Sequence, residues 1–149
     1  MNTRRSFLRT VAAAGAASFL PAHSYLRAQG SNSAIRVAGI GVGGRGSGLF
    51  KEAYATKAAR LVALCDLDPK RVASGKATFE ADPAMGGQQI TTYTDVRRLI
   101  ESKEIDAVMI ATPNHWHSLA AIWALQAGLD VYVEKPVSHT VWEGRQLVS

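Results

Sequence analysis

Short runs of apolar residues alternate with helical patterns along the chain after residue 33. Three runs are of strand length and almost continuously apolar, at 34–40, 60–66 and 106–112, and two weaker β-rich runs lie at 90–94 and 130–134. Continuous apolar runs are typical of parallel strands that are covered on both faces. Strands that alternate with helices through right-handed crossovers predict a doubly wound α/β domain with a parallel sheet of strand order 3-2-1-4-5.

Capping residues mark the expected starts of two helices. Asp68 precedes Pro69, which suits the first position of a helix that we expect to run to about Glu80. Thr140 and Glu143 have the spacing of a capping box, so a further helix is predicted to begin there. In a doubly wound domain, such helices connect successive strands or cover a face of the sheet.

Another helix is expected after the apolar run at 106–112. Asn114 is a suitable N-cap residue, and Gly128 stands where a left-handed residue commonly follows the end of a helix. The segment between them has an apolar face, and we expect Trp123 on that face to be a core residue.

The positive charge of the chain is concentrated at its N-terminus. The 149 residues carry a formal charge of +5, with 17 Lys and Arg against 12 Asp and Glu. Four arginines and no acidic residue occur in residues 1–30, which leaves 13 basic and 12 acidic residues in the remainder. A chain that is 47% hydrophobic and nearly balanced in charge beyond its leader is typical of a globular domain, and we expect no nucleic-acid partner.

The first 30 residues have the organisation of an export signal. Arg4 and Arg5 precede an apolar stretch, Val11–Leu20, that is too short to span a bilayer. The segment "TRRSFLR" resembles the twin-arginine signal, which implies the twin-arginine export machinery as a partner, a periplasmic or extracytoplasmic location and no stable membrane span. A disordered basic tail or a frayed amphipathic helix is the alternative. We expect a signal peptide and junction over 1–30 and a folded domain over 31–149.

Cysteine and histidine offer little for a metal site. Cys65 is the only cysteine, which excludes an intramolecular disulfide and a cysteine-based zinc site, and we expect it to be buried on a strand. His115 and His117 could present two ligands, but no third ligand has a convincing spacing. We therefore expect no metal, and we interpret His115 as part of a cleft wall or an interface.

A glycine-rich turn follows the first predicted strand. Gly41, Gly43 and Gly46 form G-x-G-x-x-G, and Asp66 ends the next strand 20 residues after Gly46. The first glycine permits a tight turn, the second admits a pyrophosphate to the backbone and the third lets the helix pack on its strand. Unpaired N–H groups at the helix N-terminus favour phosphate, and Arg45 could add charge or stack on adenine. The pattern predicts a dinucleotide site in a Rossmann domain.

Asp66 decides which dinucleotide we expect. Its carboxylate would accept hydrogen bonds from ribose hydroxyls and repel a 2′-phosphate, so NAD is favoured over NADP. Methyltransferases that bind S-adenosylmethionine also combine a glycine turn with an acidic residue after the second strand, and this alternative stays open at this point.

Two further segments should meet the glycine turn. "ATPNHWHS" at 111–118 follows the fourth strand, and "VYVEKPVS" at 131–138 covers the fifth strand and its exit. In the expected strand order the first and fourth strands are neighbours whose connections leave in opposite directions, which opens a crevice where ligands bind. The three segments are therefore predicted to converge on one cleft.

The motifs "AGIGVGGRG", "TPNHWH" and "EKP", in this order and spacing, resemble the N-terminal half of the Gfo/Idh/MocA family (glucose–fructose oxidoreductase, inositol dehydrogenase, rhizopine catabolism). The resemblance runs from about residue 34 to the end, and its E-K-P segment argues against a methyltransferase. It implies that Lys135 acts on the substrate hydroxyl or carbonyl and that Glu134 lies beside the nicotinamide ribose. It also implies a cofactor cleft lined by Thr112, Pro113, Asn114 and His117.

The resemblance implies the NAD-binding part of an exported oxidoreductase that transfers hydride between a nicotinamide cofactor and a sugar or cyclitol. A lysine there would stabilise the alkoxide that develops as hydride departs. The family places a second α/β domain, and through it possible homo-oligomer contacts, after this one, so 31–149 is expected to be truncated in its last helix and inactive alone. The alternatives are a non-catalytic dinucleotide-binding module and an NAD-dependent glycosidase of the same family.

Overall fold

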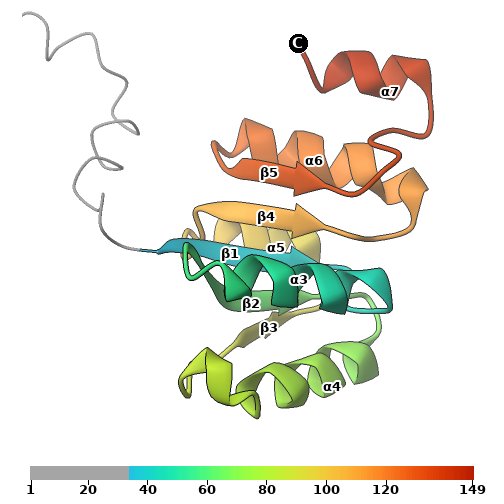
Figure 1. The fold of residues 1–149 in the computed structure, drawn as a ribbon. Helices are drawn as coiled ribbons and strands as arrows, with labels where there is room; N and C mark the ends of the chain where they lie inside the picture. The colour runs from blue at the N-terminus through green and yellow to red at the C-terminus, as the bar shows by residue number, and fades with distance from the viewer. Residues whose placement is uncertain (1–33) are drawn as a thin grey trace, which may run out of the picture. The chain divides into compact units, whose positions relative to one another are not determined.

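Five parallel strands form one sheet in the computed structural model, which describes residues 34–149 (Figure 1). Their order is β3-β2-β1-β4-β5, as the sequence predicts. The predicted leader lies outside the described residues. The strands are β1 (Ile35–Ile40), β2 (Ala59–Cys65), β3 (Thr91–Tyr93), β4 (Ala107–Ile110) and β5 (Asp130–Val133).

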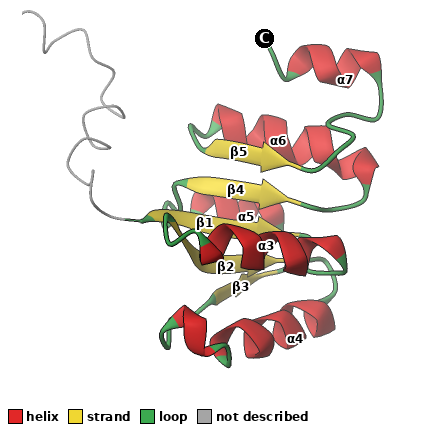
Figure 2. Ribbon diagram, in the orientation of Figure 1, coloured by secondary structure: helices red, strands yellow, loops and turns green. Residues whose placement is uncertain are grey.

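Helices cover both faces of the sheet (Figure 2). Asp68 caps α4 by accepting from the Lys70 N–H at 2.9 Å, and Pro69 opens that helix, as expected. The capping box of Thr140 and Glu143 is also present, at the start of α7. The helices are α3 (Arg45–Ala55), α4 (Pro69–Glu80), α5 (Val96–Glu101), α6 (His117–Gln126) and α7 (Val141–Gln146), with 3-10 turns η1 (Pro83–Met85) and η2 (Asn114–Trp116).

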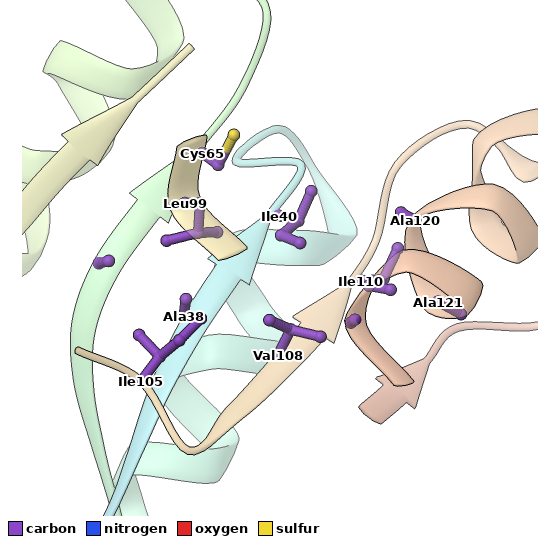
Figure 3. Packing of buried hydrophobic residues seen from close by; sticks show 11 residues of the cluster. Ala38, Ile40, Cys65, Leu99, Ile105, Val108, Ile110, Ala120 and Ala121 are labelled. Carbon is purple, nitrogen blue, oxygen red and sulfur yellow. The ribbon is translucent and has the colours of Figure 1, made fainter. Parts of the chain in front are cut away.

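Two apolar cores lie on opposite faces of the sheet. On one face, Leu99 of α5 and the alanines of α6 pack against the central strands, and Figure 3 shows Leu99 and Ala120 on either side of Ile40. On the other face, Phe50 of α3 and Phe79 of α4 are both 1% exposed and lie 6.4 Å apart between ring centroids. Burial of strands on both faces explains their continuous apolar runs. Cys65, 1% exposed, belongs to the first core, as expected.

Main-chain hydrogen bonds continue past the ends of the strands. The Gly41 N–H donates to the Cys65 carbonyl, the Ala111 N–H to the Ile40 carbonyl and the Glu134 N–H to the Ile110 carbonyl, at 2.8, 2.8 and 2.9 Å. The exits of β1, β4 and β5 are thereby held at one edge of the sheet. Since α3 and α6 belong to opposite cores, the chain leaves β1 and β4 toward opposite faces, and this is the switch point that the sequence predicts.

The start of α6 differs from the prediction. The expected N-cap role of Asn114 is wrong, because Asn114 begins a 3-10 turn and α6 begins at His117 without a side-chain cap. Pro113 is extended, with φ −55° and ψ 145°, and its carbonyl accepts from the Trp116 N–H at 2.9 Å. Because of this tighter turn, α6 begins two residues later than an N-cap at Asn114 would place it. Gly128 has φ +79°, as expected of a residue that follows a helix.

Candidate dinucleotide-binding site

The glycine turn after β1 lies directly against the turn after β4. Gly41 has φ +89°, and a Cβ on it would lie 2.7 Å from main-chain atoms of Ala111 and Thr112. Gly44 has φ +42° and precedes α3. A side chain at either position would have to adopt a left-handed backbone, and at Gly41 it would also strike the neighbouring turn. Glycine is therefore required at Gly41 for the two turns to approach each other, and it is favoured at Gly44 by the left-handed backbone.

Gly46 has the packing role that the sequence predicts. It is buried in the first turn of α3, and a Cβ on it would collide with the Gly41 carbonyl oxygen and lie 3.3 Å from the Ala111 Cβ. The Ser47 hydroxyl donates to the Val42 carbonyl at 2.6 Å and ties the same turn to the helix. The start of α3 can therefore approach the end of β1 closely, as the third glycine of the motif requires.

A cavity of about 830 Å³ opens beside these turns. It reaches from the glycine turn, past the end of β2, to the segment after β4, so two of the three segments that were predicted to converge share it. The third, 131–138, contributes no residue to its lining. Its walls are mainly apolar, with a few polar groups, as is usual for sites that hold cofactors. The predicted site residues that line it are Gly41, Gly43, Asp66, Thr112 and Pro113, together with His115 from the expected cleft wall.

Asp66 faces the cavity and also holds the glycine turn. One carboxylate oxygen accepts from the Val42 N–H at 2.9 Å and the other from the Asp68 N–H at 3.0 Å. Each oxygen of a carboxylate has acceptor capacity for a second hydrogen bond, so contact with ribose hydroxyls remains compatible with these two bonds. The predicted ribose contact remains a prediction, and the structure adds a second role, which is to fix the turn.

Arg45 and Glu134 bind each other. Arg45 Nε donates to Glu134 Oε1 at 2.7 Å, and Arg45 Nη1 donates to Glu52 at 3.3 Å. The other Glu134 oxygen accepts from the Lys135 N–H at 3.2 Å. The Arg45 hydrogen bond, followed by the main-chain one, lowers the pKa of Glu134 below its ordinary value. Neither Arg45 nor Glu134 lines the cavity, and their predicted contact with a cofactor stays a prediction.

The His117 ring contacts the main-chain carbonyl of Thr112. The Thr112 hydroxyl is buried without a hydrogen-bond partner among residues 34–149, although the residue lines the cavity. His117 is 3% exposed, and its Nε2 lies 2.7 Å from the Thr112 carbonyl oxygen. Its Nδ1 lies 2.7 Å from the Pro136 carbonyl oxygen. Neither His117 nor Asn114 lines the cavity, so their cofactor contacts also stay predictions.

Lys135 stands just beyond the end of β5. Its side chain is exposed, and its ammonium makes no hydrogen bond within the part of the chain that the structure describes. The peptide bond that follows it, to Pro136, is cis. An ammonium without an internal hydrogen bond is available to a ligand, and the predicted catalytic role of Lys135 remains a prediction.

Several residues that line the cavity escaped the sequence analysis. Trp123 is wrong as a core residue, because it is partly exposed and lines the cavity, with its ring 6.4 Å from that of Trp116. The two residues are seven positions apart, a spacing that returns to the same side of a helical segment and could have linked them. Others missed were Leu67 and Arg71 after β2 and the segment 94–97 before and within α5.

The described residues offer neither a metal cluster nor a membrane helix. Over 34–149, no group of three or more His, Cys, Asp and Glu side chains is arranged to hold a metal ion. No helix in that range combines the length and apolar character needed to cross a bilayer.

The residues present fit a dinucleotide. Gly41, Gly43 and Gly44 line the cavity with main chain alone, and the buried Thr112 hydroxyl lacks a partner that a ligand could supply. Asp66 presents a carboxylate inside the same cavity. Together with the parallel sheet and its switch point, these features define a dinucleotide-binding domain of the Rossmann type.

The chain belongs to the Gfo/Idh/MocA oxidoreductase family with an NAD-binding Rossmann fold, whose family model matches residues 35–149. A glycosyl hydrolase family 109 protein of Stenotrophomonas maltophilia (strain K279a) is 38% identical over 137 residues, which are 88% of this chain and 29% of that protein. The agreement of fold, motifs and family confirms the predicted class of domain and its NAD-type cofactor.

Solved structures resemble the same domain. Myo-inositol 2-dehydrogenase from Lactobacillus plantarum is 30% identical with a TM-score of 0.62, over 77% of this chain and 32% of that one. The WlbA dehydrogenase from Bordetella pertussis, solved with NADH and UDP-GlcNAcA, is 26% identical with a TM-score of 0.65, over 77% of this chain and 33% of that one. The chain spans about a third of the length of these relatives.

Proposed function

We propose that this chain is the NAD-binding part of an oxidoreductase that transfers hydride between NAD and a hydroxyl group of a sugar or cyclitol. The observation that carries the proposal is the contact of the glycine turn with the Thr112 turn, at the edge where Lys135 leaves β5. The sugar and cyclitol dehydrogenases among the similar structures support this substrate class.

Different residues of the chain would bind different parts of NAD. The main chain of the glycine turn, with the Arg71 guanidinium beside Gly43, and the N-terminus of α3, an 11-residue helix, would receive the pyrophosphate. Asp66 would accept from ribose hydroxyls, and the Thr112 hydroxyl would hydrogen-bond the nicotinamide half. NAD, when bound, supplies the acceptor for hydride.

Lys135 would stabilise charge on the substrate. Oxidation of a sugar CH–OH transfers hydride from carbon to NAD and releases the hydroxyl proton to water. Negative charge builds on the oxygen as that proton leaves, and an ammonium within hydrogen-bond reach lowers the energy of that state. Lys135 is suited to this because no internal hydrogen bond holds its ammonium. The substrate walls would come from outside the chain described here, in keeping with relatives more than twice its length.

The full-length protein tests this proposal. Wild-type protein with NAD and a panel of sugars and cyclitols should form NADH, measured by its absorbance. Lys135→Met should reduce turnover by about 100-fold or more, because one preorganised charge contributes that much to such steps, while NADH affinity stays within about threefold. Unchanged turnover in the variant would remove Lys135 from the mechanism.

Cleavage of glycosidic bonds through transient oxidation is a second candidate, favoured by the name of the relative that is 38% identical. The same domain would then oxidise the sugar and later return the hydride. An aryl glycoside assay distinguishes the two functions. Release of the aryl alcohol with NAD present in less than stoichiometric amount, and without accumulation of NADH, supports glycoside cleavage, whereas accumulation of NADH supports the dehydrogenase.

We also propose that residues 1–30 direct export through the twin-arginine route. The support is the pair Arg4 and Arg5 followed by a short apolar stretch without acidic residues. Changing both arginines to lysine should retain the protein in the cytoplasm, measured by fractionation of the cells. Arg27→Lys is the matched control, because it keeps the pair intact and should leave export unchanged. Continued export of the double variant would reject the leader assignment.

A further inference from the structure

His117 is a buried polar residue that the proposed chemistry does not use. Its side chain is 3% exposed at the first position of α6, behind the turn that lines the cavity. Nε2 lies 2.7 Å from the carbonyl oxygen of Thr112, and Nδ1 lies 2.7 Å from the carbonyl oxygen of Pro136. The ring thus stands between the segment after β4 and the segment after β5.

Both neighbours of the ring are acceptors. A carbonyl oxygen can only accept a hydrogen bond, whereas an imidazole nitrogen either donates through its N–H or presents a lone pair. In the neutral ring one nitrogen always carries a lone pair, and at 2.7 Å that lone pair would face the lone pairs of a carbonyl oxygen. Two contacts of this length are both favourable only when both ring nitrogens carry protons.

We propose that His117 donates from both ring nitrogens and thereby cross-links the Thr112 turn to the Lys135–Pro136 segment, as a positioning residue for the hydride transfer proposed above. The inference rests on that proposed function for its catalytic consequence, but the cross-link itself does not. Hydrogen bonds from a doubly protonated ring are charge-assisted and stronger than neutral ones. The two main-chain segments are therefore fixed relative to each other.

The cross-link affects the position of Lys135. It directly precedes Pro136, whose carbonyl the ring holds, and Thr112 carries the buried hydroxyl without a partner among residues 34–149. A cross-link between these segments sets how far the Lys135 backbone lies from the cofactor side of the cleft. Small displacements of reacting groups reduce rates steeply, so a residue that touches no ligand can still control turnover.

Nitrogen NMR of the 149-residue chain, labelled with ¹⁵N-histidine, tests the cross-link without any cofactor. The signals of His117 are assigned by their loss in His117→Gln. Both ring nitrogens should resonate as N–H donors at neutral pH and correlate with slowly exchanging protons. A lone-pair signal from either nitrogen would overturn the proposal. His139→Gln serves as the control, because His139 is exposed and its ring makes no hydrogen bond among the described residues.

Kinetics of the full-length protein test the positioning role. His117→Gln should lower kcat about 10- to 100-fold while KM for NAD changes less than about threefold, because the glycine turn is untouched and only the alignment of Lys135 is lost. A folded variant whose kcat stays within about twofold of wild type would overturn this role. If the variant does not fold, the NMR result on the wild type decides. Failure of wild-type protein to bind NADH would refute the proposed function but not the cross-link.

Discussion

Arg45 and Glu134 are 89 residues apart in the chain, and the guanidinium Nε of one lies 2.7 Å from the carboxylate Oε1 of the other. Arg45 is the first residue of α3, which follows the glycine turn, and Glu134 directly follows β5. The pair therefore joins two segments that the sequence assigned separately to the cofactor. This ion pair lies at the edge of the sheet where β1, β4 and β5 end.

The ion pair between Arg45 and Glu134 predicts how the pKa of Glu134 responds to mutation. The Arg45 hydrogen bond holds the pKa of Glu134 below its usual range, so the carboxylate stays ionised further into the acid range than an ordinary glutamate. In Arg45→Gln its pKa should rise toward the ordinary value, because the larger cause of the lowering is removed. Carbon NMR of the Glu134 carboxyl during a pH titration measures the change. Arg98→Gln, an exposed arginine paired with Glu101, is the control and should leave Glu134 unchanged.

Asp66 predicts the preference among dinucleotides. Asp66→Ala should weaken NADH binding by about tenfold, because a hydrogen bond to a charged group is lost, and should weaken NADPH binding much less. The fluorescence changes of NADH and of NADPH on binding measure the two affinities. Asp66→Asn keeps an acceptor for the Val42 N–H but removes the negative charge. It therefore distinguishes the effect of the charge on binding from the effect of disturbing the glycine turn. Equal weakening of both dinucleotides in Asp66→Ala would refute the ribose role.

Two glycines close together in the chain predict opposite effects on stability. Gly41→Ala should destabilise the domain by about 1–3 kcal/mol, because the residue has φ +89° and its Cβ would lie 2.7 Å from neighbouring main chain. Gly48→Ala should stabilise it by about 0.5–1 kcal/mol, because Gly48 lies inside α3 with open space around the position of a Cβ. Urea unfolding measures both. Similar effects of the two changes would contradict the tight approach at Gly41.

Asp95 predicts loss of stability in acid. Hydrogen bonds from the Arg97 side chain and main chain lower its pKa from 3.8 to about 2. The folded-state pKa lies below the unfolded one, so the stabilisation is fully present above the unfolded value and is lost as pH falls from about 4 to 2. Asp95→Asn keeps a capping acceptor for α5 but cannot titrate, so its stability should decline less over that range. Parallel unfolding curves for both proteins between those pH values would contradict this account.

Local sequence was sufficient where a structure depends on neighbours in the chain. The caps at Asp68 and Thr140 and the left-handed Gly128 are short-range features, and the structure has all three. The strand order also followed, because continuous apolar runs require two covered faces and crossovers have one hand. The helix α5 was missed because its six residues are too few for a clear period, although Asp95 caps it.

The parts of the site that sequence analysis missed depend on contacts between distant segments. Trp123 was expected in the core because it is large and apolar, but the small residues Ala121 and Ala124 form the buried side of α6, and Trp123 lines the cavity instead. Arg71 reaches the glycine turn from α4, where its Nη1 occupies the space that a Cβ on Gly43 would take, 2.5 Å away. The contact between Arg71 and the glycine turn has no counterpart in the spacing of residues along the chain.

The sequence by itself determined the class of this domain, because a glycine turn between a strand and a helix, and an acid at the end of the next strand, are local patterns with a local physical cause. Only the tertiary structure decided what those residues do to one another. The pairing of Arg45 with Glu134 and the placement of the His117 ring between two carbonyls arise where parallel strands end at a common edge, and that edge exists only once the sheet has formed.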